Sequence, residues 1–322
     1  MTNILVTGGT GFLGSNLVKR LVYEKNNVTV FDNDFRGSIR NLENNQNLKL
    51  IKGDIRNLNQ VKNSLENIDI IFHLAFINGT KYFYENPSLV MEVGIKGMLN
   101  LLDAIKDSNV KKIILASSSE VYQTPKQIPT DENIECIVPD IKNPRYSYGG
   151  SKIINELLLM HNENSKFIDK IIFRPLNVYG PNMGWEHVIP EIIKKIFFST
   201  NYLKNKSGSI EIQGSGNETR SFCYIDDAID SLMLLNNQGE NNEIYNIGND
   251  HEISIIELIN YIQEHLGTEI SIVTKNLSKG STKRRNPNLK KIKKLGFKNK
   301  VNIKDGLKKT IDWYLKNINK LN

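Results

Sequence analysis

The chain has 322 residues, of which 39% are apolar and 24% charged, and its net charge is +7. This length suits one large domain or two interleaved ones, and the composition excludes a disordered chain and a membrane helix, since no apolar run reaches roughly 18 residues. The apolar strand expected from Ile4 leaves no room for a secretory signal, and Cys136 and Cys223 do not have the spacing of a disulfide framework or a thiolate metal site. We therefore expect a cytoplasmic protein with no membrane partner.

Apolar runs of strand length alternate with amphipathic segments of helix length from the first residues. Because most of these runs are apolar at successive positions, both faces of each strand should be covered, as in a parallel, doubly wound sheet with right-handed crossovers. Helices are predicted at 15–23, at 87–107, where Pro87 suits the first helical position, and at 147–162. Strands are predicted at 4–7, 28–32, 48–53, 70–74, 112–116 and 170–174.

Beyond Pro175 the predicted elements become shorter and mixed, and the stretches 207–217 and 279–288, rich in Gly, Ser and Asn, are predicted to be loops. The fold class expected is therefore α/β, a Rossmann-type doubly wound parallel sheet with a smaller mixed α/β domain at its carboxyl edge. The predicted division gives 1–176 and 221–248 to the Rossmann-type domain, and 177–220 and 249–322 to the smaller domain.

The C-terminal region carries most of the positive charge. Residues 275–322 hold 16 lysines and arginines and only two acidic residues, whereas the rest of the chain is net negative. A basic tail can bind nucleic acid. Here, however, apolar residues recur at helical spacing with lysines between them, which favours the solvated face of a packed helix and no nucleic-acid partner. These apolar residues are Leu307, Ile311, Tyr314, Leu315 and Ile318.

A glycine-rich turn, TGGTGFLG at 7–14, joins the first predicted strand to the first predicted helix. Its glycines, Gly8, Gly11 and Gly14, would let the backbone approach a pyrophosphate at the N-terminus of that helix. The second strand ends in Asp32, whose carboxylate can accept both ribose hydroxyls of adenosine and would repel a 2′-phosphate. The pattern therefore predicts NAD as the cofactor, while Arg36 is the one nearby residue that favours NADP.

Three Tyr-x-x-x-Lys pairs occur in the chain, and such a pair can supply a base. A tyrosine and a lysine four residues apart share one face of a helix, where the ammonium favours the phenolate and lowers the pKa of the tyrosine. Pro125 interrupts Tyr122/Lys126, and Tyr202/Lys206 lies in a polar stretch that runs into Gly208. Tyr148/Lys152 instead opens the helix predicted at 147–162, and it is the pair predicted to be catalytic.

Together these segments resemble the extended short-chain dehydrogenase/reductases of the nucleotide-sugar epimerase/dehydratase family, over nearly the whole chain. The resemblance implies an NAD-dependent enzyme of carbohydrate biosynthesis that acts on a nucleotide-diphosphate sugar, and a homodimer built from the helices at 87–107 and 147–162. The stretches that match are TGGTGFLGS (7–15), Asp32, GDIRN (53–57), HLA (73–75), ASSSEVY (116–122), YGGSK (148–152), FRPLNVYGP (173–181), TRSFCYIDD (219–227) and RRNP (284–287).

The resemblance also implies roles for individual residues. In catalysis, Ser118 would hydrogen-bond the sugar hydroxyl, Tyr148 would be the base, Lys152 would anchor the nicotinamide ribose, and Glu120 would have a role in some branches. The cofactor would contact Gly8, Gly11, Phe12, Leu13, Gly14, Asp32, Asp54, Ile55, Leu74, Ala75, Ser117, Tyr148, Lys152 and Pro175. The substrate would contact Ser118, Ser119, Asn177, Val188, Arg220 and Arg285.

Several of these residues also have a purely structural interpretation. Arginine binds phosphate oxygens through its planar fork, but Arg220 and Arg285 could instead pair with Asp226 and Asp227. Trp185 could stack on a sugar or simply pack. His73 follows an apolar strand and is expected to be a core histidine. The remaining histidines lack the spacing of metal ligands, so no metal is expected.

The family resemblance leaves the overall reaction open. All branches begin with oxidation of the sugar at C4, and they diverge in the triplet at 118–120. Related 4,6-dehydratases have Thr-Asp-Glu there, with the Asp protonating the departing 6-hydroxyl and the Glu removing the C5 proton, whereas Ser119 replaces that Asp here. A Ser-Glu pair occurs in UDP-glucuronate decarboxylases and GDP-mannose dehydratases, and 4-epimerases commonly lack an acid at the last position.

The triplet does not settle the branch by itself. Ser118 in place of the usual Thr and a distinct segment at 182–187, where the resemblance places the sugar, count against decarboxylation and GDP-mannose dehydration. We therefore expect a nucleotide-sugar 4-epimerase that works through a transient 4-keto sugar. A decarboxylase or a 4,6-dehydratase that uses Glu120 is the alternative. A redox-silent NAD-binding regulator is an alternative of another class, and the presence of Ser118, Tyr148 and Lys152 counts against it.

Overall fold

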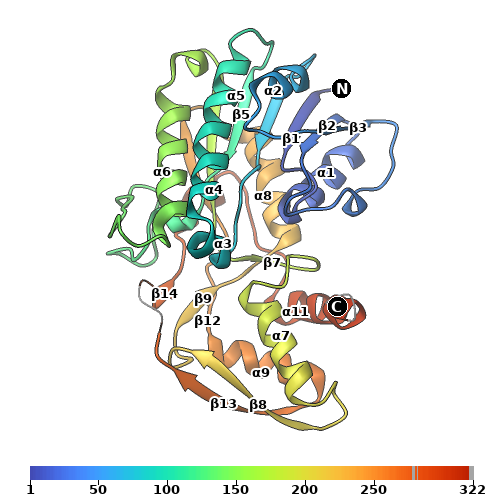
Figure 1. Cartoon of the computed structure of the whole chain (residues 1–322), viewed down its shortest axis with the longest axis vertical. Helices are drawn as coiled ribbons and strands as arrows, with labels where there is room; N and C mark the ends of the chain where they lie inside the picture. Colours follow the sequence, from blue (N-terminus) through green and yellow to red (C-terminus); the bar gives the residue numbers. More distant parts are fainter. Residues whose placement is uncertain (278–279, 281, 319–322) are drawn as a thin grey trace.

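A computed structural model describes residues 1–277, 280 and 282–318, and a seven-stranded parallel sheet forms its upper half (Figure 1). The strand order is β11-β6-β5-β4-β1-β2-β3. All six predicted strands form, each within one residue of the predicted ends, and the doubly wound α/β fold is confirmed. The strands are β1 (Asn3–Thr7), β2 (Asn27–Asp32), β3 (Leu48–Lys52), β4 (Ile70–His73), β5 (Lys112–Ala116), β6 (Asp169–Pro175) and β11 (Glu243–Ile247).

Helices cover both faces of this sheet, which explains why its strands are apolar at successive positions. In β1, Ile4 and Val6 belong to the same apolar cluster as Leu17 of α1 (Phe12–Tyr23) and Ile229 of α8 (Ile225–Gln238). Leu5 belongs instead to the cluster on the opposite face, which α2 (Leu58–Ser64), α5 (Gly97–Ile105) and α6 (Tyr146–His161) complete. Neighbouring strand residues therefore face opposite layers.

The helix predicted at 87–107 is continuous but not uniform. It begins at Pro87 as α4 (Pro87–Met91), widens into a π-helical turn, η2 (Glu92–Lys96), and ends as α5 at Ile105. A short helix, α3 (Thr80–Glu85), precedes it, and α6 matches the helix predicted at 147–162 within one residue at each end. Three 3₁₀ turns complete this half, η1 (Ile39–Asn41), η3 (Ser119–Val121) and η4 (Glu163–Ser165).

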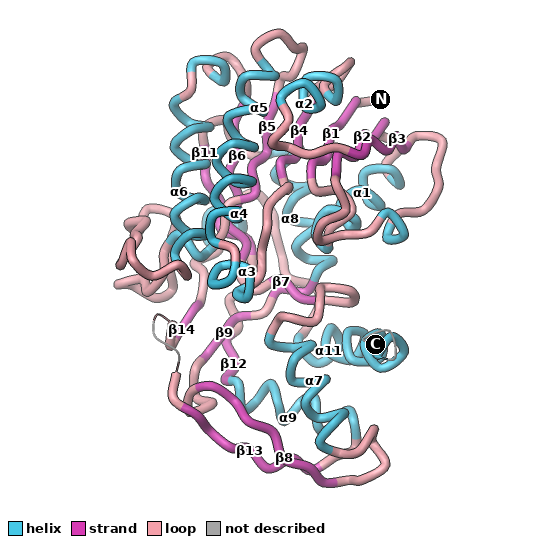
Figure 2. The backbone as a smooth tube through the Cα atoms, in the orientation of Figure 1, coloured by secondary structure: helices cyan, strands magenta, loops and turns pink. Residues whose placement is uncertain are grey.

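The lower half combines helices with small sheets (Figure 2). The strand pairs are β7 (Val178–Tyr179) with β10 (Cys223–Tyr224), and β8 (Ser207–Gln213) with β13 (Glu269–Lys275). A third sheet has the order β12 (Glu252–Ser254), β9 (Thr219–Ser221), β14 (Arg284–Arg285). The helices of this half are α7 (Val188–Ser199), α9 (Ile255–Leu266) and α11 (Ile303–Asn317), whereas α10 (Lys290–Lys294) packs against β11 of the large sheet.

No strand after β6 was predicted individually, and three of these later strands show why. The loop prediction for 207–217 is wrong because Ile210 and Ile212 alternate with exposed residues, which makes β8 a half-buried strand. In β11 the polar Asn246 interrupts the apolar pattern, yet it is buried and its side chain donates to Thr130 O. Within 279–288, Arg284–Arg285 form β14, while Lys279 and Ser281 lie outside the described residues.

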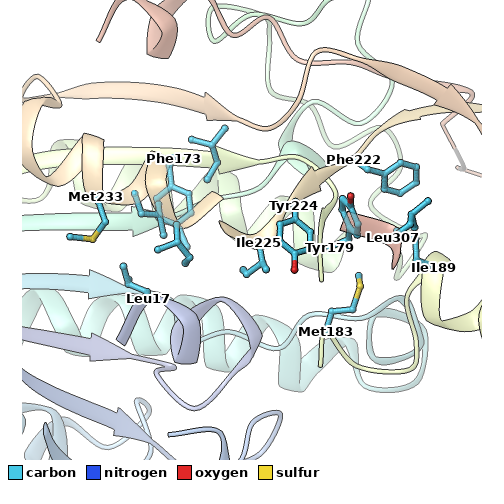
Figure 3. Packing of buried hydrophobic residues seen from close by; sticks show 14 of the residues in the cluster. Leu17, Phe173, Tyr179, Met183, Ile189, Phe222, Tyr224, Ile225, Met233 and Leu307 are labelled. Atoms are coloured by element: carbon cyan, nitrogen blue, oxygen red, sulfur yellow. The ribbon is translucent and has the colours of Figure 1, made fainter. Parts of the chain in front are cut away.

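The C-terminal helix packs as predicted, since Leu307, Ile311, Tyr314 and Ile318 are buried while Lys308 and Lys309 are exposed. Figure 3 shows that the apolar cluster is continuous from Leu17 and Phe173 beside the sheet to Leu307 of α11. The predicted division of the chain into two domains stays a prediction. In the described part of the chain, no helix has the length and apolarity to cross a membrane.

Candidate functional site

A cavity of about 650 Å³ lies at the carboxyl ends of the parallel strands, bounded on the other side by residues of the lower half. The structure brings all the residues with predicted roles to this one cavity. They are Gly8, Gly11, Phe12, Leu13, Gly14, Asp32, Asp54, Ile55, Leu74, Ala75, Ser117, Ser118, Ser119, Glu120, Tyr148, Lys152, Pro175, Asn177, Val188, Arg220 and Arg285.

The glycine-rich turn packs closely against the end of β4 and against its own backbone because its glycines lack side chains. Gly8 has φ +73°, and a Cβ there would lie 2.7 Å from Ala75 N. A Cβ at Gly14 would lie 2.1 Å from Gly8 O, so a larger residue would displace the turn from the helix. Gly11 caps α1 without a side-chain hydrogen bond, which leaves N–H groups at the first turn free to bind an anion. The turn therefore fits a dinucleotide pyrophosphate.

The adenosine end of the cavity is lined by the acidic Asp32 and Asp54 and by Arg36 of the neighbouring loop. The carboxylate of Asp32 accepts Thr10 N at 3.0 Å and Asp34 N at 2.8 Å. Arg36, which favoured NADP, is engaged elsewhere: its Nη1 donates to Glu186 Oε2 at 2.8 Å, and its guanidinium lies 4.8 Å from the centre of the Tyr82 ring. These contacts fit NAD better than NADP.

The helix α6 presents Tyr148 and Lys152 to the cavity one turn apart, and both side chains are buried. The Tyr148 ring stacks on Phe83 with a centroid distance of 4.7 Å and an interplanar angle of 17°. Lys152 Nζ donates to Ala116 O at 2.6 Å. The other two tyrosines do not line this cavity: Tyr122 OH donates to Asn246 Oδ1, and Tyr202 is exposed.

The pKa values of Tyr148 and Lys152 differ from the prediction. Burial raises the pKa of Tyr148, a hydrogen bond with Ser118 acts to lower it, and the charge of Glu120 acts to raise it. Burial also lowers the pKa of Lys152 to about 7, against the opposing charge of Glu156. We predicted that Lys152 would lower the pKa of Tyr148, but that pKa is raised. Loss of solvation disfavours the charged form of both groups.

Glu120 lies in the cavity as an ionised carboxylate held by arginines. Its Oε1 accepts Arg285 Nη1 at 2.6 Å, and its Oε2 lies 4.0 Å from Arg145 Nη2. Burial acts to raise the pKa of Glu120, but the charges of Arg285, Arg145 and Arg220 outweigh it, so the pKa is lowered. The carboxylate is therefore available as a base or a charge at neutral pH, and not as an acid.

A further arginine, Arg220, makes this end of the cavity strongly basic. Arg220 donates to Thr219 O at 2.7 Å and to Thr282 O at 2.6 Å, and burial, followed by the charge of Arg285, lowers its pKa to about 10. Within the described residues, neither Arg220 nor Arg285 forms an ion pair with Asp226 or Asp227. Three arginines around one carboxylate leave a net positive charge, which suits an anion such as a diphosphate.

A known protein family matches most of the chain. Residues 4–248 match the family model described as the NAD dependent epimerase/dehydratase family. The chain belongs to this family. It is an enzyme with NAD as its cofactor, and the resemblance inferred from its motifs is confirmed.

Individual relatives in the epimerase/dehydratase family have different activities. The chain is 32% identical to a putative UDP-glucose 4-epimerase of Methanocaldococcus jannaschii, over 98% of this chain and 99% of that protein. It is also 32% identical to UDP-glucuronic acid decarboxylase 5 of Arabidopsis thaliana, over 94% of this chain and 86% of the relative. Among solved structures, DesIV, a dTDP-glucose 4,6-dehydratase from Streptomyces venezuelae with NAD bound, superposes with a TM-score of 0.88 at 26% identity, covering 99% and 98% of the two chains.

Two residues that the sequence left ambiguous have structural roles in this family member. His73 is a core histidine: its Nδ1 lies 2.8 Å from Thr7 Oγ1, and burial lowers its pKa to about 3. Trp185 packs edge-on against Tyr314 at 4.5 Å and does not line the cavity. In the part of the chain that the structure describes, no group of three or more His, Cys, Asp or Glu side chains could hold a metal ion.

Several cavity residues were not predicted at all. Phe76 and Asn78 follow β4 directly, and Arg145 precedes α6. The signal that could have identified Phe76 and Asn78 is positional, since residues just after the carboxyl end of a parallel strand line the ligand crevice. Glu186 and Phe83 give no comparable signal, because only the tertiary fold brings them to the cavity.

Proposed function

We propose that the protein is a nucleotide-sugar 4-epimerase that acts through a transient 4-keto sugar. The observation that supports this most directly is the position of Ser118, Tyr148 and Lys152 in one cavity, between a turn that fits a dinucleotide and a cluster of arginines that fits a nucleotide diphosphate. This arrangement would hold the sugar against the Tyr148 hydroxyl. It also argues against a redox-silent regulator, since the catalytic set is assembled.

The proposed chemistry divides between the chain and the cofactor. The turn at 8–14 and Asp32 would hold NAD, with Lys152 on the nicotinamide ribose, and the bound cofactor supplies a reversible hydride acceptor. Tyr148 removes the proton of the 4-hydroxyl, and Ser118 hydrogen-bonds the sugar while its hydrogen bond with Tyr148 opposes the rise of the phenol pKa that burial causes. Arg220, Arg285 and Asn177 bind the substrate diphosphate. Return of the hydride to the other face of C4 completes the epimerisation.

The acidic groups of the cavity support epimerisation over 4,6-dehydration. Four carboxylates line the cavity, of which Asp32 and Asp54 lie at the adenosine end and Glu186 is bound by Arg36. Glu120 alone lies beside the Ser118–Tyr148 pair, and its arginine partners keep it ionised. Dehydration needs an acid for the leaving hydroxyl as well as a base for C5, and Ser119 stands where that acid would be.

Decarboxylation is the second candidate, and one observation favours it. Arg145 Nη2 lies 4.0 Å from the Glu120 carboxylate, which Arg285 binds more closely. The buried Nε of Arg145 has no hydrogen-bond partner among the described residues. A guanidinium in this position could bind the carboxylate of a uronic acid sugar. Glu120 would then act near C5 of the sugar.

Turnover of a panel of nucleotide sugars in deuterated water tests the epimerase proposal. A 4-epimerase returns the same hydride to C4, so its product should carry no carbon-bound deuterium and should have an unchanged mass. A decarboxylase would release carbon dioxide and take a solvent deuteron at C5, and a dehydratase would lose water and also gain deuterium at C5. Deuterium at C5 would therefore rule out the epimerase.

We also propose a cytoplasmic homodimer that pairs the long helices of two copies. Four apolar side chains on α4, α5 and α6 are exposed: Met91 by 43%, Leu99 by 41%, Ile154 by 37% and Leu157 by 54%. These helices pack against one another, so their exposed apolar residues share one side of the molecule. Leu157→Asp should convert the dimer to a monomer in sedimentation, whereas Phe167→Asp, which changes an exposed residue outside these helices, should not.

We further propose the division into an NAD-binding domain, 1–176 and 221–248, and a nucleotide-sugar-binding domain, 177–220 and 249–322. The cavity lies between residues of both segments, as a site for two ligands would require.

A further inference from the structure

One aromatic ring contacts both members of the Tyr148–Lys152 pair. Phe76 follows Leu74 and Ala75 at the end of β4, and the Lys152 ammonium lies 3.8 Å from the centre of its ring. The Tyr148 ring meets the same Phe76 ring edge-on, with centroids 5.1 Å apart and an interplanar angle of 87°. A cation over an aromatic face at this distance is attracted by the negative face of the ring.

The position of the Phe76 ring depends on the π-helical turn η2. A Cβ at Gly94, in the middle of this turn, would lie 2.5 Å from the Phe76 ring. The ring therefore fits only because residue 94 is glycine. Such π-helical turns are often found at functional sites. Two elements thus hold the ring over Lys152, the end of β4 and the turn η2.

The other groups around Lys152 do not outweigh the effect of burial, which lowers the pKa of the ammonium. On α6, Glu156 is one turn away, but its carboxylate accepts hydrogen bonds from Arg174 at 2.6 and 2.9 Å and from Ser117. On β4, burial keeps His73 neutral, with a pKa lowered to about 3. On β5, Ala116 O accepts from Lys152, and the Tyr148 phenol is neutral because burial raises its pKa. Two ring faces also attract the ammonium, and that of Phe76 at 3.8 Å is much nearer than that of Tyr148 at 5.7 Å.

We propose that Phe76 is a positioning residue, whose ring face keeps Lys152 charged and fixes its Nζ beside Tyr148. The functional meaning of this contact rests on the proposed catalytic role of the Tyr148–Lys152 pair. The proposed contact affects the ionisation of Lys152, which can be measured without an assay of turnover.

The test measures the ionisation of Lys152 in the full-length protein saturated with NAD. Lysine labelled with carbon-13 at Cε is followed by NMR as the pH is raised, and Lys152→Met identifies the Lys152 signal. Phe76→Leu should lower the pKa of Lys152 by about half a unit to one unit, the size expected for loss of a desolvated cation–π contact. The alkaline limb of the activity profile should move to lower pH by the same amount, since the ammonium is then lost earlier as the pH rises. Phe76→Tyr, which keeps the ring face, should restore both.

Phe83 provides the matched control. Its ring stacks on Tyr148 at 4.7 Å, so Phe83→Leu removes a similar apolar area from the same pair and should leave the pKa of Lys152 unchanged. The proposal is overturned if Phe76→Leu leaves the titration of Lys152 unchanged, or if Phe83→Leu shifts it equally. If Phe76→Leu does not fold, Gly94→Ala, which pushes the ring away, should give the same shift, and no shift would overturn the proposal.

The same data separate this proposal from the proposed function. A Tyr148→Phe protein that keeps full activity would contradict the catalytic role of the pair, while the titration of Lys152 would still decide the role of Phe76.

Discussion

Glu120 and Arg285 form an ion pair of 2.6 Å although 165 residues separate them in the sequence. Their side chains are only 22% and 11% exposed, so neither charge is well solvated without the other. The pair connects η3, beside the proposed catalytic residues Ser118 and Tyr148, to β14 in the lower half of the molecule. Removing either partner should therefore have consequences for both stability and pH dependence.

We expect Arg285→Gln to destabilise the protein by roughly 1–3 kcal/mol, because it leaves a partly buried carboxylate without its main partner. Arg285 helps to lower the pKa of Glu120, so its loss should raise that pKa, and Glu120 should become protonated at a higher pH as the pH falls. Urea unfolding between pH 4 and 8 should show a loss of stability that is largest near neutral pH and becomes smaller as the pH falls, because protonation of Glu120 removes the unpaired charge. Glu120→Gln in the same background should remove the difference in pH dependence, and an unchanged profile in Arg285→Gln would contradict the pairing.

Tyr148→Phe should keep the binding of NAD and of the nucleotide sugar but lose at least about a hundredfold in turnover, a typical contribution of general-base catalysis. Tyr122→Phe and Tyr202→Phe serve as controls. Tyr122 OH contacts Arg174 and Asn246 in the interior, so its loss should lower the melting temperature more than the turnover, and Tyr202 is exposed. A larger loss of turnover in either control would show that the wrong pair was chosen.

NAD should protect the protein against heat more than NADP at equal concentration, because Asp32 would repel a 2′-phosphate and Arg36 is bound by Glu186. Asp32→Ser should narrow the difference between the melting temperatures with the two nucleotides. Scanning calorimetry or a dye-based melt would measure it. A wild-type protein that gains more from NADP would contradict the assignment of Asp32.

The buried His73 should make the fold sensitive to mild acid. Its pKa in the folded state is about 3, well below the ordinary value near 6.5, so the unfolded chain binds more protons between these pH values. Stability should therefore fall as the pH is lowered from about 6.5 towards 3. His73→Gln, which cannot be protonated, should show a flatter dependence over this range by urea unfolding, and an identical slope would mean that other groups dominate.

The local sequence pattern alone predicted much of the fold and part of the candidate site. The apolar runs predicted β1 to β6 because strands covered on both faces must be apolar at successive positions. Gly8, Gly11 and Gly14 were recognisable from their place between a strand and a helix, and Tyr148/Lys152 from the helix that follows. In each case the signal lies within about one element, so no knowledge of distant contacts was needed.

Other features depend on contacts that no local spacing encodes. Glu186 accepts a hydrogen bond from Arg36, 150 residues away in the sequence. The Phe76 ring lies over Lys152 because Gly94, in the π-helical turn, leaves space for it. The strand β8 was missed because it begins with Ser207, Gly208 and Ser209, which are typical of a loop, and its apolar alternation is short.

The sequence by itself thus determined the sheet, the cofactor and the family of this protein, since these follow from periodicity and from motifs within single elements. The tertiary structure decided the charge states. The pKa of Tyr148 is raised and that of Lys152 lowered because both are buried, and Glu120 stays ionised because Arg145, Arg220 and Arg285 converge on it. Burial and electrostatic attraction depend on distances in space, which the order of residues along the chain does not specify.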